Sequence, residues 1–201
     1  MKQFVVLLAF ITLAFAWHDD GPEVPDTSPT PLQREAYERF DRFFTFATTR
    51  DMYADPFEYA WEPHEVTTED GYILTLFRIF KRDSPRPDNI VMYNFDVGFD
   101  EARLFKVSFF FPSNEKLQIF NMIDMGFDVW TCAFRGTEYN QGHVSLSTSS
   151  FEYWDFSFDE QADYDLPAAV DYVYKQGDGQ KIYVFNSSLA CMIWWLALDV
   201  D

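Results

Sequence analysis

The sequence predicts an α/β fold in which a β-hairpin is followed by a mostly parallel, doubly wound sheet. The hairpin is predicted by residues 65–80, EVTTEDGYILTLFRIF, where Glu69-Asp70-Gly71 separates two β-rich runs. The sheet is predicted by the chain from residue 89 onward, where strand-like and helix-like runs alternate. Alternation of this kind is typical of strands linked by crossover helices.

The alternating runs are apolar enough for a sheet that is covered on both faces. The expected strands are 89–95 (NIVMYNF), 126–134 (GFDVWTCAF) and 181–185 (KIYVF), and the expected helices are 115–125, 163–177 and 189–199. The last helix is apolar nearly all round, so it needs cover on both sides. We expect either a protein partner or a further part of the fold to supply the outer cover.

The first residues are expected to be a cleaved leader. Residues 1–16 contain a lysine, an apolar run and a small-x-small end, which is the pattern of a secretory signal peptide. The run is shorter than the roughly 20 residues that span a bilayer, so cleavage is favoured over a retained anchor. No transmembrane segment is expected after cleavage. Residues 17–31 are acidic and rich in proline, which predicts a flexible leader to the folded part.

Residues 32–57 are expected to form an N-terminal helical segment. Thr30-Pro31 provides an N-cap followed by proline at the first helical position. Apolar residues then recur at spacings of three and four: Leu32, Ala36, Tyr37, Phe40, Phe43, Phe44 and Ala47. We expect this face to pack on the core, and residues 58–201 to form the one remaining domain.

The composition excludes several classes of function. With 33 acidic and 15 basic residues the formal net charge is −18, which disfavours nucleic acid and anionic membranes held by charge alone. The sequence has no phosphate loop, dinucleotide fingerprint or cluster of metal ligands, so no cofactor is expected. Cys132 and Cys191 fall in runs that should be buried, which favours two core thiols over a disulfide.

An acidic stretch after residue 150 is expected to be solvated or to cap helices. It consists of Asp155, Asp159, Glu160, Asp163 and Asp165. These residues lack the spacing of a calcium-binding loop. Upstream of them, Arg135-Gly136 is expected to anchor a loop, with Arg135 paired to a nearby carboxylate.

Three long blocks resemble one known family. They are HEVTTEDGYILTLFRIF (64–80), GFDVWTCAFRGTEYNQGHVSLS (126–147) and EYWDFSFDEQADYDLPAAVDYV (152–173). They are similar to the opening hairpin, the central strand with its Arg-Gly loop, and the loop and helix before the nucleophile strand of the secreted acid lipases. That family contains the gastric and lysosomal lipases of the α/β-hydrolase fold. With their spacing, the blocks cover residues from about 58 to 201.

The resemblance implies an incomplete α/β-hydrolase core without a lid domain. It also implies a location that is secreted, extracellular or in a lysosome-like lumen. The ancestral activity that it implies is hydrolysis of neutral-lipid esters, of the triacylglycerol or cholesteryl ester class, through a serine acyl-enzyme.

Ser187 falls on the family's nucleophile position. The family motif is G-x-S-x-G, but here Phe185 and Leu189 stand at the two glycines and Asn186 replaces the usual histidine. Glycine permits the strained turn that presents the serine, and two bulky residues should relax or block it. Two interpretations are open: Ser187 is a nucleophile, or Asn186 or Ser187 caps the last helix, which the bulky residues favour. The same residues form a glycosylation sequon, which a buried turn should leave unmodified.

The expected oxyanion-binding groups are the backbone N–H groups of Val97 and Ser188. In the family a His-Gly pair precedes the first of these, and this sequence has Phe95-Asp96 there. A carboxylate at Asp96 would oppose the negative charge that develops on the substrate oxygen. Loss of one donor costs on the order of 10² to 10³ in rate.

The histidine required by a family-style triad does not follow Ser187. The order in this fold is serine, acid, histidine, and only Asp199 and Asp201 carry charge after Ser187. The chain's histidines all lie upstream: His18, His64 and His143. His143 matches a histidine of the family's Arg-Gly loop and is expected to be structural, and His64 is expected in a strand.

The sequence therefore predicts an acid-lipase-like protein of lipid metabolism that is catalytically impaired or inactive as encoded. One alternative is a non-catalytic protein that binds a neutral-lipid or lipid-ester surface, or a protein partner on its last helix. A second alternative is a fragment of a longer, active lipase.

Overall fold

A computed structural model of the chain describes residues 5–9, 34–35, 37–42, 44, 58–94 and 118–198. Its seven-stranded sheet has the order β1-β7-β4-β5-β3-β2, and β6 pairs with β3 off this path. The strands are β1 (Val5–Ala9), β2 (Tyr59–Thr67), β3 (Tyr72–Lys81), β4 (Asn89–Asn94), β5 (Phe127–Cys132), β6 (Gly142–His143) and β7 (Ile182–Ser187).

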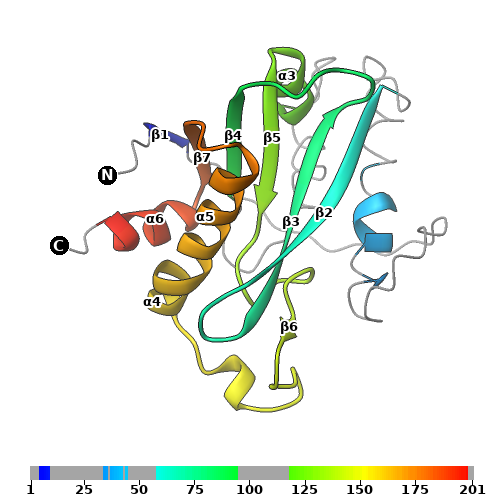
Figure 1. Cartoon of the computed structure of the whole chain (residues 1–201). Coiled ribbons are helices and arrows are strands. Elements are labelled where there is room, and N and C mark those ends of the chain that lie inside the picture. Colours follow the sequence, from blue (N-terminus) through cyan, green and yellow to red (C-terminus); the bar gives the residue numbers. More distant parts are fainter. Residues whose placement is uncertain are drawn as a thin grey trace.

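Helices cover both faces of the sheet, so the predicted doubly wound arrangement is confirmed (Figure 1). The described helices are α3 (Gln118–Asp124), the 3₁₀ turn η1 (Glu152–Trp154), α4 (Phe158–Glu160), the π-helix η2 (Gln161–Asp165), α5 (Leu166–Gln176) and α6 (Ala190–Leu198). The helix α3 packs on one face, and η2, α5 and α6 pack on the other.

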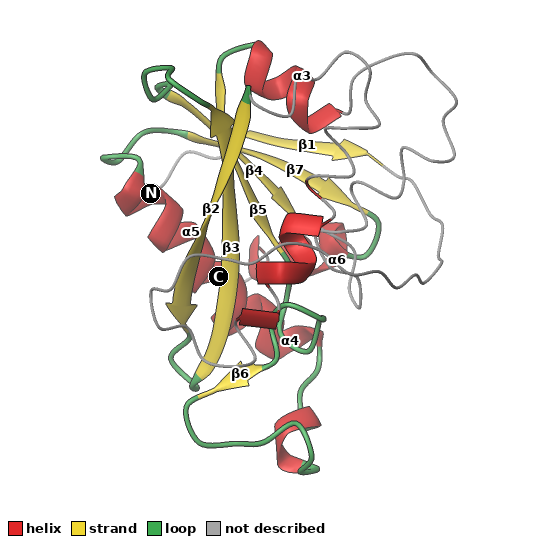
Figure 2. Cartoon of the chain, turned by 90° about the vertical axis from the view of Figure 1, so that its right-hand side faces the viewer, coloured by secondary structure: helices red, strands yellow, loops and turns green. Residues whose placement is uncertain are grey.

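The strands divide into an antiparallel and a parallel part. β2 and β3 form the predicted hairpin, closed by the N–H of Thr68, which donates to the carbonyl of Tyr72 at 2.8 Å. Gly71 takes a positive φ of 98° in this turn, which only glycine adopts without strain. β1, β7, β4 and β5 run parallel, and β3 joins them antiparallel to β5. Figure 2 shows the twist of the sheet between the hairpin and β1.

The N-terminal helical residues pack on the core, as the periodicity predicts. Tyr37, Phe40 and Phe44 are buried in the cluster that also contains α3. The ring of Phe40 stacks on that of Phe77 from β3, with 3.8 Å between the centroids. The other predicted members of this face lie outside the described residues: Leu32, Ala36, Phe43 and Ala47.

Residues predicted to be part of a signal peptide form the edge strand of the sheet. β1 pairs with β7 along its whole length, and Leu8 lies opposite Asn186. Cleavage after residue 16 stays a prediction, as do the boundaries of the leader and of the helical segment. No helix in the described ranges is long and apolar enough to cross a membrane.

Three boundaries differ from the sequence-based expectation. β7 continues to Ser187 instead of ending at Phe185, and α6 begins only at Ala190. The helix expected from residue 163 begins with the π-helical turn η2, whose last residue, Asp165, is held by Arg135. A tertiary contact with Arg135 holds this start in place, and residue periodicity does not report such contacts.

Candidate functional site

The candidate site lies where the carboxyl ends of β4 and β7 meet. After β4 the chain forms α3 on one face of the sheet, and after β7 it forms α6 on the other face. The connections therefore diverge between β4 and β7, which are neighbours in the sheet. Ligands of open α/β sheets bind outside the carboxyl ends of the strands at such a point. Ser187 is the last residue of β7.

The left-handed position of the strand-to-helix turn is Ser188, and not Ser187. Ser188 has φ of +50°, whereas Ser187 lies within the strand opposite Ala9. A nucleophilic serine on a sharp strand-to-helix turn would itself occupy the strained position. The carbonyl oxygens of Ser188 and Leu189 accept from the N–H groups of Cys191 and Met192, at 3.1 and 2.9 Å, and so begin α6. The turn is thus shifted by one residue from the predicted one.

Phe185 is accommodated by the core. Its ring stacks on that of Tyr93, with 4.7 Å between the centroids and 29° between the planes. Both side chains are buried on the face covered by α3, and this burial raises the pKa of Tyr93 to about 12. The aromatic pair favours regular pairing of β7 with β4. The family motif has a glycine at this position, which would allow the strand and the following helix to approach closely.

Two asparagines lie side by side at this end of the sheet. Asn94 of β4 and Asn186 of β7 are register partners, and both are completely buried. Both atoms of each side-chain amide have no hydrogen-bond partner in the described part of the chain. Asn186 therefore does not cap α6, so this part of the capping hypothesis is wrong. A buried amide is also a poor glycosylation acceptor, in line with the sequence-based expectation.

The predicted oxyanion-binding groups are only partly placed by the structure. Ser188 follows β7 and is half-buried, so its N–H lies at the turn after the strand. Val97 lies outside the described residues, as do Phe95 and Asp96. The roles of Ser187, Ser188 and Val97 stay predictions.

Both described histidines lie away from β7 in the strand order. His143 on β6 accepts two backbone N–H groups at Nδ1, from Ser145 at 3.0 Å and Leu146 at 2.9 Å. Its Nε2 must then carry the proton, and it lies 3.2 Å from the carbonyl oxygen of Asp70. The structural role expected for His143 is confirmed. His64 is half-buried on β2, the strand at the far edge of the sheet, as expected.

Cys132 and Cys191 are buried as thiols, as the sequence predicts. Cys132 ends β5 and lies opposite Asn94 in the same row of the sheet. Cys191 lies on the inner face of α6. No group of three or more histidine, cysteine, aspartate or glutamate residues within the described ranges is arranged to hold a metal ion.

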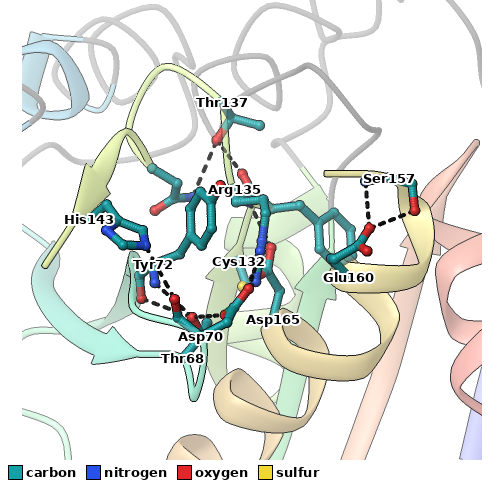
Figure 3. A network of polar contacts seen from close by, with 12 residues as sticks. Thr68, Asp70, Tyr72, Cys132, Arg135, Thr137, His143, Ser157, Glu160 and Asp165 are labelled. Atoms are coloured by element: carbon teal, nitrogen blue, oxygen red, sulfur yellow. Dashed lines mark hydrogen bonds and ion pairs between the residues drawn. The ribbon is translucent and has the colours of Figure 1, made fainter. Parts of the chain in front are cut away.

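A second polar centre surrounds Arg135, in the loop after β5 (Figure 3). Its Nη1 and Nη2 donate to the two carboxylate oxygens of Asp70 at 2.5 and 2.9 Å. Its Nε and backbone N–H donate to the two oxygens of Asp165, both at 2.8 Å. The guanidinium lies over the ring of Tyr72, 3.8 Å from its centroid. The predicted pairing of Arg135 is confirmed, with two carboxylates in place of one.

Asp165 is therefore not the solvated residue that the acidic stretch suggests. It is completely buried, and this burial raises its pKa to about 6, although Arg135 acts in the opposite direction. Glu160 does cap a helix: its carboxylate accepts from the N–H of Ser157 at 2.6 Å in a capping box. The periodicity of the sequence could not separate these two acids, because only the tertiary contact with Arg135 distinguishes them.

The Arg135 centre is a structural ion-pair network and not a reaction site. It joins the hairpin turn through Asp70, the loop after β5 through Arg135, and the start of α5 through Asp165. All three charged groups are satisfied by one another. The sequence indicated only that Arg135 would find a carboxylate, and hairpin residue Asp70 carried no signal of this role.

Comparison with known proteins matches this fold and site to one group. The family model "Partial alpha/beta-hydrolase lipase region" matches residues 51–93. The chain is 35% identical to human "Lipase member N" over 147 residues, which are 70% of this chain and 35% of that protein. It is 34% identical to "Lysosomal acid lipase/cholesteryl ester hydrolase" of Rattus norvegicus over 146 residues, covering 70% and 36%. It is 33% identical to "Gastric triacylglycerol lipase" of Mus musculus over 145 residues, covering 71% and 36%.

The solved structures agree on the fold. Oligopeptidase B from Leishmania major superposes with a TM-score of 0.51 at 13% identity, over 73% of this chain and 19% of that protein. The chain spans about a third of the length of the lipases it matches. This chain carries a partial α/β-hydrolase lipase region and is homologous to the gastric and lysosomal acid lipases over about 70% of its length.

Proposed function

We propose that this chain is an acid-lipase-like protein of lipid metabolism that hydrolyses esters poorly or not at all. Its ancestry points to neutral-lipid esters, because its relatives are named for triacylglycerol and cholesteryl ester hydrolysis. The predicted signal peptide and the relatives together support a secreted or lysosome-like location. The observation that carries the loss of activity is the turn after β7, where Ser187 lies in the strand and Ser188 takes the left-handed position.

The chemistry of acyl transfer explains why this turn matters. A serine hydroxyl is a weak nucleophile and needs a base within hydrogen-bond reach. The two described histidines contact other groups: His143 binds backbone N–H groups and His64 binds Tyr172. The neighbouring amides of Asn94 and Asn186 beside the turn supply neither a base nor a charge.

The test is ester turnover by the whole chain. A short-chain nitrophenyl ester and a triacylglycerol emulsion are the substrates, and a fluorophosphonate probe reports an activated serine. We expect turnover and labelling equal to those of Ser187→Ala, with Ser188→Ala as the matched control one residue away. Turnover or labelling that disappears only in Ser187→Ala would overturn the proposal.

A second candidate function is non-catalytic binding through α6. The outward side chains of this helix are apolar and exposed in the described structure: Met192, Trp195, Leu196 and Leu198. Such a surface suits a neutral-lipid surface or a protein partner, because large apolar patches mark interaction sites. Flotation with a triacylglycerol emulsion and light scattering test the two, with Trp195→Gln as the variant. A monodisperse monomer that does not float would remove this candidate.

A third candidate is a fragment of a longer, active lipase. The coverage of about a third of each relative is the observation that favours it. The intact mass of the protein from its natural source tests it. A mass well above the 23.7 kDa of this sequence would favour a longer enzyme, and a mass at or below it would remove the candidate.

A further inference from the structure

The loop between β6 and α4 carries an exposed aromatic pair. Phe151 is 80% exposed and Trp154 is 45% exposed, although phenylalanine and tryptophan side chains are mostly buried in folded proteins. Trp154 is the last residue of the 3₁₀ turn η1, and Phe151 directly precedes the first. This turn lies at the lower end of the molecule in Figure 1, in yellow, beyond β6 and α4. One projecting loop therefore presents two large aromatic rings to the solvent.

The geometry of the turn places the two rings on the same side. The N–H of Trp154 donates to the carbonyl of Phe151 at 2.9 Å, which is the hydrogen bond of a 3₁₀ helix. Three residues make one turn of such a helix, so side chains three positions apart eclipse each other. Glu152 and Asp155 are also three positions apart, and both are exposed. Since Tyr153 is completely buried, the turn has an aromatic side, an acidic side and an inner side.

The inner side holds the turn in place. The hydroxyl of Tyr153 donates to the carbonyl of Asn140 at 3.2 Å, and the carbonyl of Tyr153 accepts from the hydroxyl of Tyr72 at 2.5 Å. The indole N–H of Trp154 donates to the carbonyl of Thr148 at 2.7 Å. Because these contacts already order the turn, a ligand that binds to it has little conformational entropy to remove.

The charge around the aromatic pair is strongly negative. The sequence contains no lysine or arginine from residue 136 to residue 174, and Glu152 and Asp155 lie beside the pair. An anionic membrane attracts basic segments, so its surface would repel this one. Quaternary ammonium groups, in contrast, bind to aromatic faces, and nearby carboxylates attract them further. The surface is therefore complementary to a lipid layer whose outermost groups are cationic, as in phosphatidylcholine.

We propose that residues 151–155 form a docking surface for a phosphatidylcholine layer. Phe151 and Trp154 enter the headgroup region, where aromatic side chains are favoured. Glu152 and Asp155 face the trimethylammonium groups of the lipid. The loop leaves the sheet at the carboxyl end of β5, which runs parallel to β4, so docking turns the end of the sheet with the candidate site toward the lipid. This surface requires neither ester hydrolysis nor α6.

The test is flotation of the whole chain with phosphatidylcholine vesicles and, separately, with phosphatidylglycerol vesicles. We expect the chain to float with phosphatidylcholine, and Phe151→Ser to lower its partition coefficient about tenfold, because one aromatic ring leaves the lipid. Phe151→Trp, which keeps a ring, should bind like the wild type. Met125→Ser is the control, since Met125 is also largely exposed but lies after α3. It should not change the partition coefficient.

The role of the carboxylates has its own variant. Glu152→Gln combined with Asp155→Asn should weaken binding to phosphatidylcholine about threefold, because the attraction for the ammonium groups is lost. The same double variant should bind phosphatidylglycerol more tightly than the wild type does, because repulsion is lost as well. Asp178→Asn removes an exposed carboxylate after α5 and should leave both partition coefficients unchanged.

Three results would overturn the docking surface. The first is a wild-type chain that does not float with phosphatidylcholine vesicles. The second is Phe151→Ser that floats as well as the wild type, which would assign the lipid contact to another surface, such as α6. The third is a double carboxylate variant that binds phosphatidylcholine more tightly, which would leave no role for the ammonium groups. None of these results bears on ester turnover, so this inference and the proposed loss of activity fail separately.

Discussion

Asn94 and Asn186 face each other across the pairing of β4 and β7, completely buried and without hydrogen-bond partners among the described residues. Burial of an unsatisfied polar group costs about 1–3 kcal/mol. Alternation along the strands places both amides on the face of Met92 and Val184, which pack in the cluster with the inner side of α6. The unsatisfied amides of Asn94 and Asn186 therefore lie beneath α6, the helix that follows the candidate site.

Replacement of one of these amides by an apolar side chain should stabilise the protein. We expect Asn186→Leu to raise the free energy of unfolding by about 1 kcal/mol, because it removes an unpaired polar group. Urea unfolding measures the change. The matched control is Asn140→Leu, since Asn140 is equally buried but donates to the carbonyl of Ala133 at 2.9 Å and accepts from the N–H of Thr75. That control should lose about 2 kcal/mol, and a loss of the same size in Asn186→Leu would contradict the prediction.

Glycine at the left-handed position of the turn should also be stabilising. A left-handed conformation costs a non-glycine residue roughly 1 kcal/mol, so we expect Ser188→Gly, at φ of +50°, to raise the melting temperature by about 2–4 °C. Ser187→Gly is the matched control. Because Ser187 lies in an extended strand, glycine there should lower stability by about 0.5–1 kcal/mol. The opposite pair of signs would place the strained residue at Ser187 after all.

Loss of the guanidinium at Arg135 should be costly. Arg135→Met leaves Asp165 buried without its cation, and breaking a buried pair in this way costs about 3–5 kcal/mol. Chemical denaturation gives the difference. Arg39→Met is the control, because Arg39 also pairs with two carboxylates, those of Glu35 and Glu138, but at an exposed position, and should lose at most about 1 kcal/mol. Similar losses in the two variants would mean that the Arg135 ion-pair network contributes no more to stability than an exposed ion pair does.

The cost of Arg135→Met should grow with pH. Burial raises the pKa of Asp165 from 3.8 to about 6. The stability that the protonated carboxyl contributes is therefore complete below pH 3.8 and is lost as the pH rises through about 6. Without Arg135 the carboxyl is harder still to ionise. We expect the loss of stability in Arg135→Met to be larger at about pH 8 than at about pH 4. Arg135 also holds the pKa of Asp70 below its ordinary value, so the background for the control is Asp70→Asn with Asp165→Asn. The same comparison in that background should show no pH dependence, and a dependence that persists there would assign it to another group.

The sequence predicts the elements of this fold because local signals agree with tertiary ones over most of the chain. The hairpin at Glu69-Asp70-Gly71, the buried strand at 89–94 and the thiols of Cys132 and Cys191 are all read from turn residues and apolar runs. Each of these features is fixed by its own composition or by that of its neighbours.

Features fixed by distant partners could not be read in this way. Asp165 has the same local setting as Asp163, yet it is buried because Arg135, thirty residues earlier, binds it. Asparagine is a common helix cap, but Asn186 is part of β7, and the pairing of β7 with β4 extends to this residue. His64 carries no local mark of its contact with Tyr172, which lies 108 positions later. Tertiary packing decides all three.

The pairing of β1 with β7 bears on the order of folding. It joins Val5 to Tyr183, whereas the hairpin joins Tyr59 to Lys81. Closing a long loop costs more chain entropy than closing a short one, so the hairpin can form early and β1 should join the sheet last. If export removes residues 1–16, the cut precedes this final step and leaves the edge of β7 open to another strand. Removal of the leader would then determine whether β7 pairs with the N-terminal strand of its own chain or can pair with a strand of another molecule.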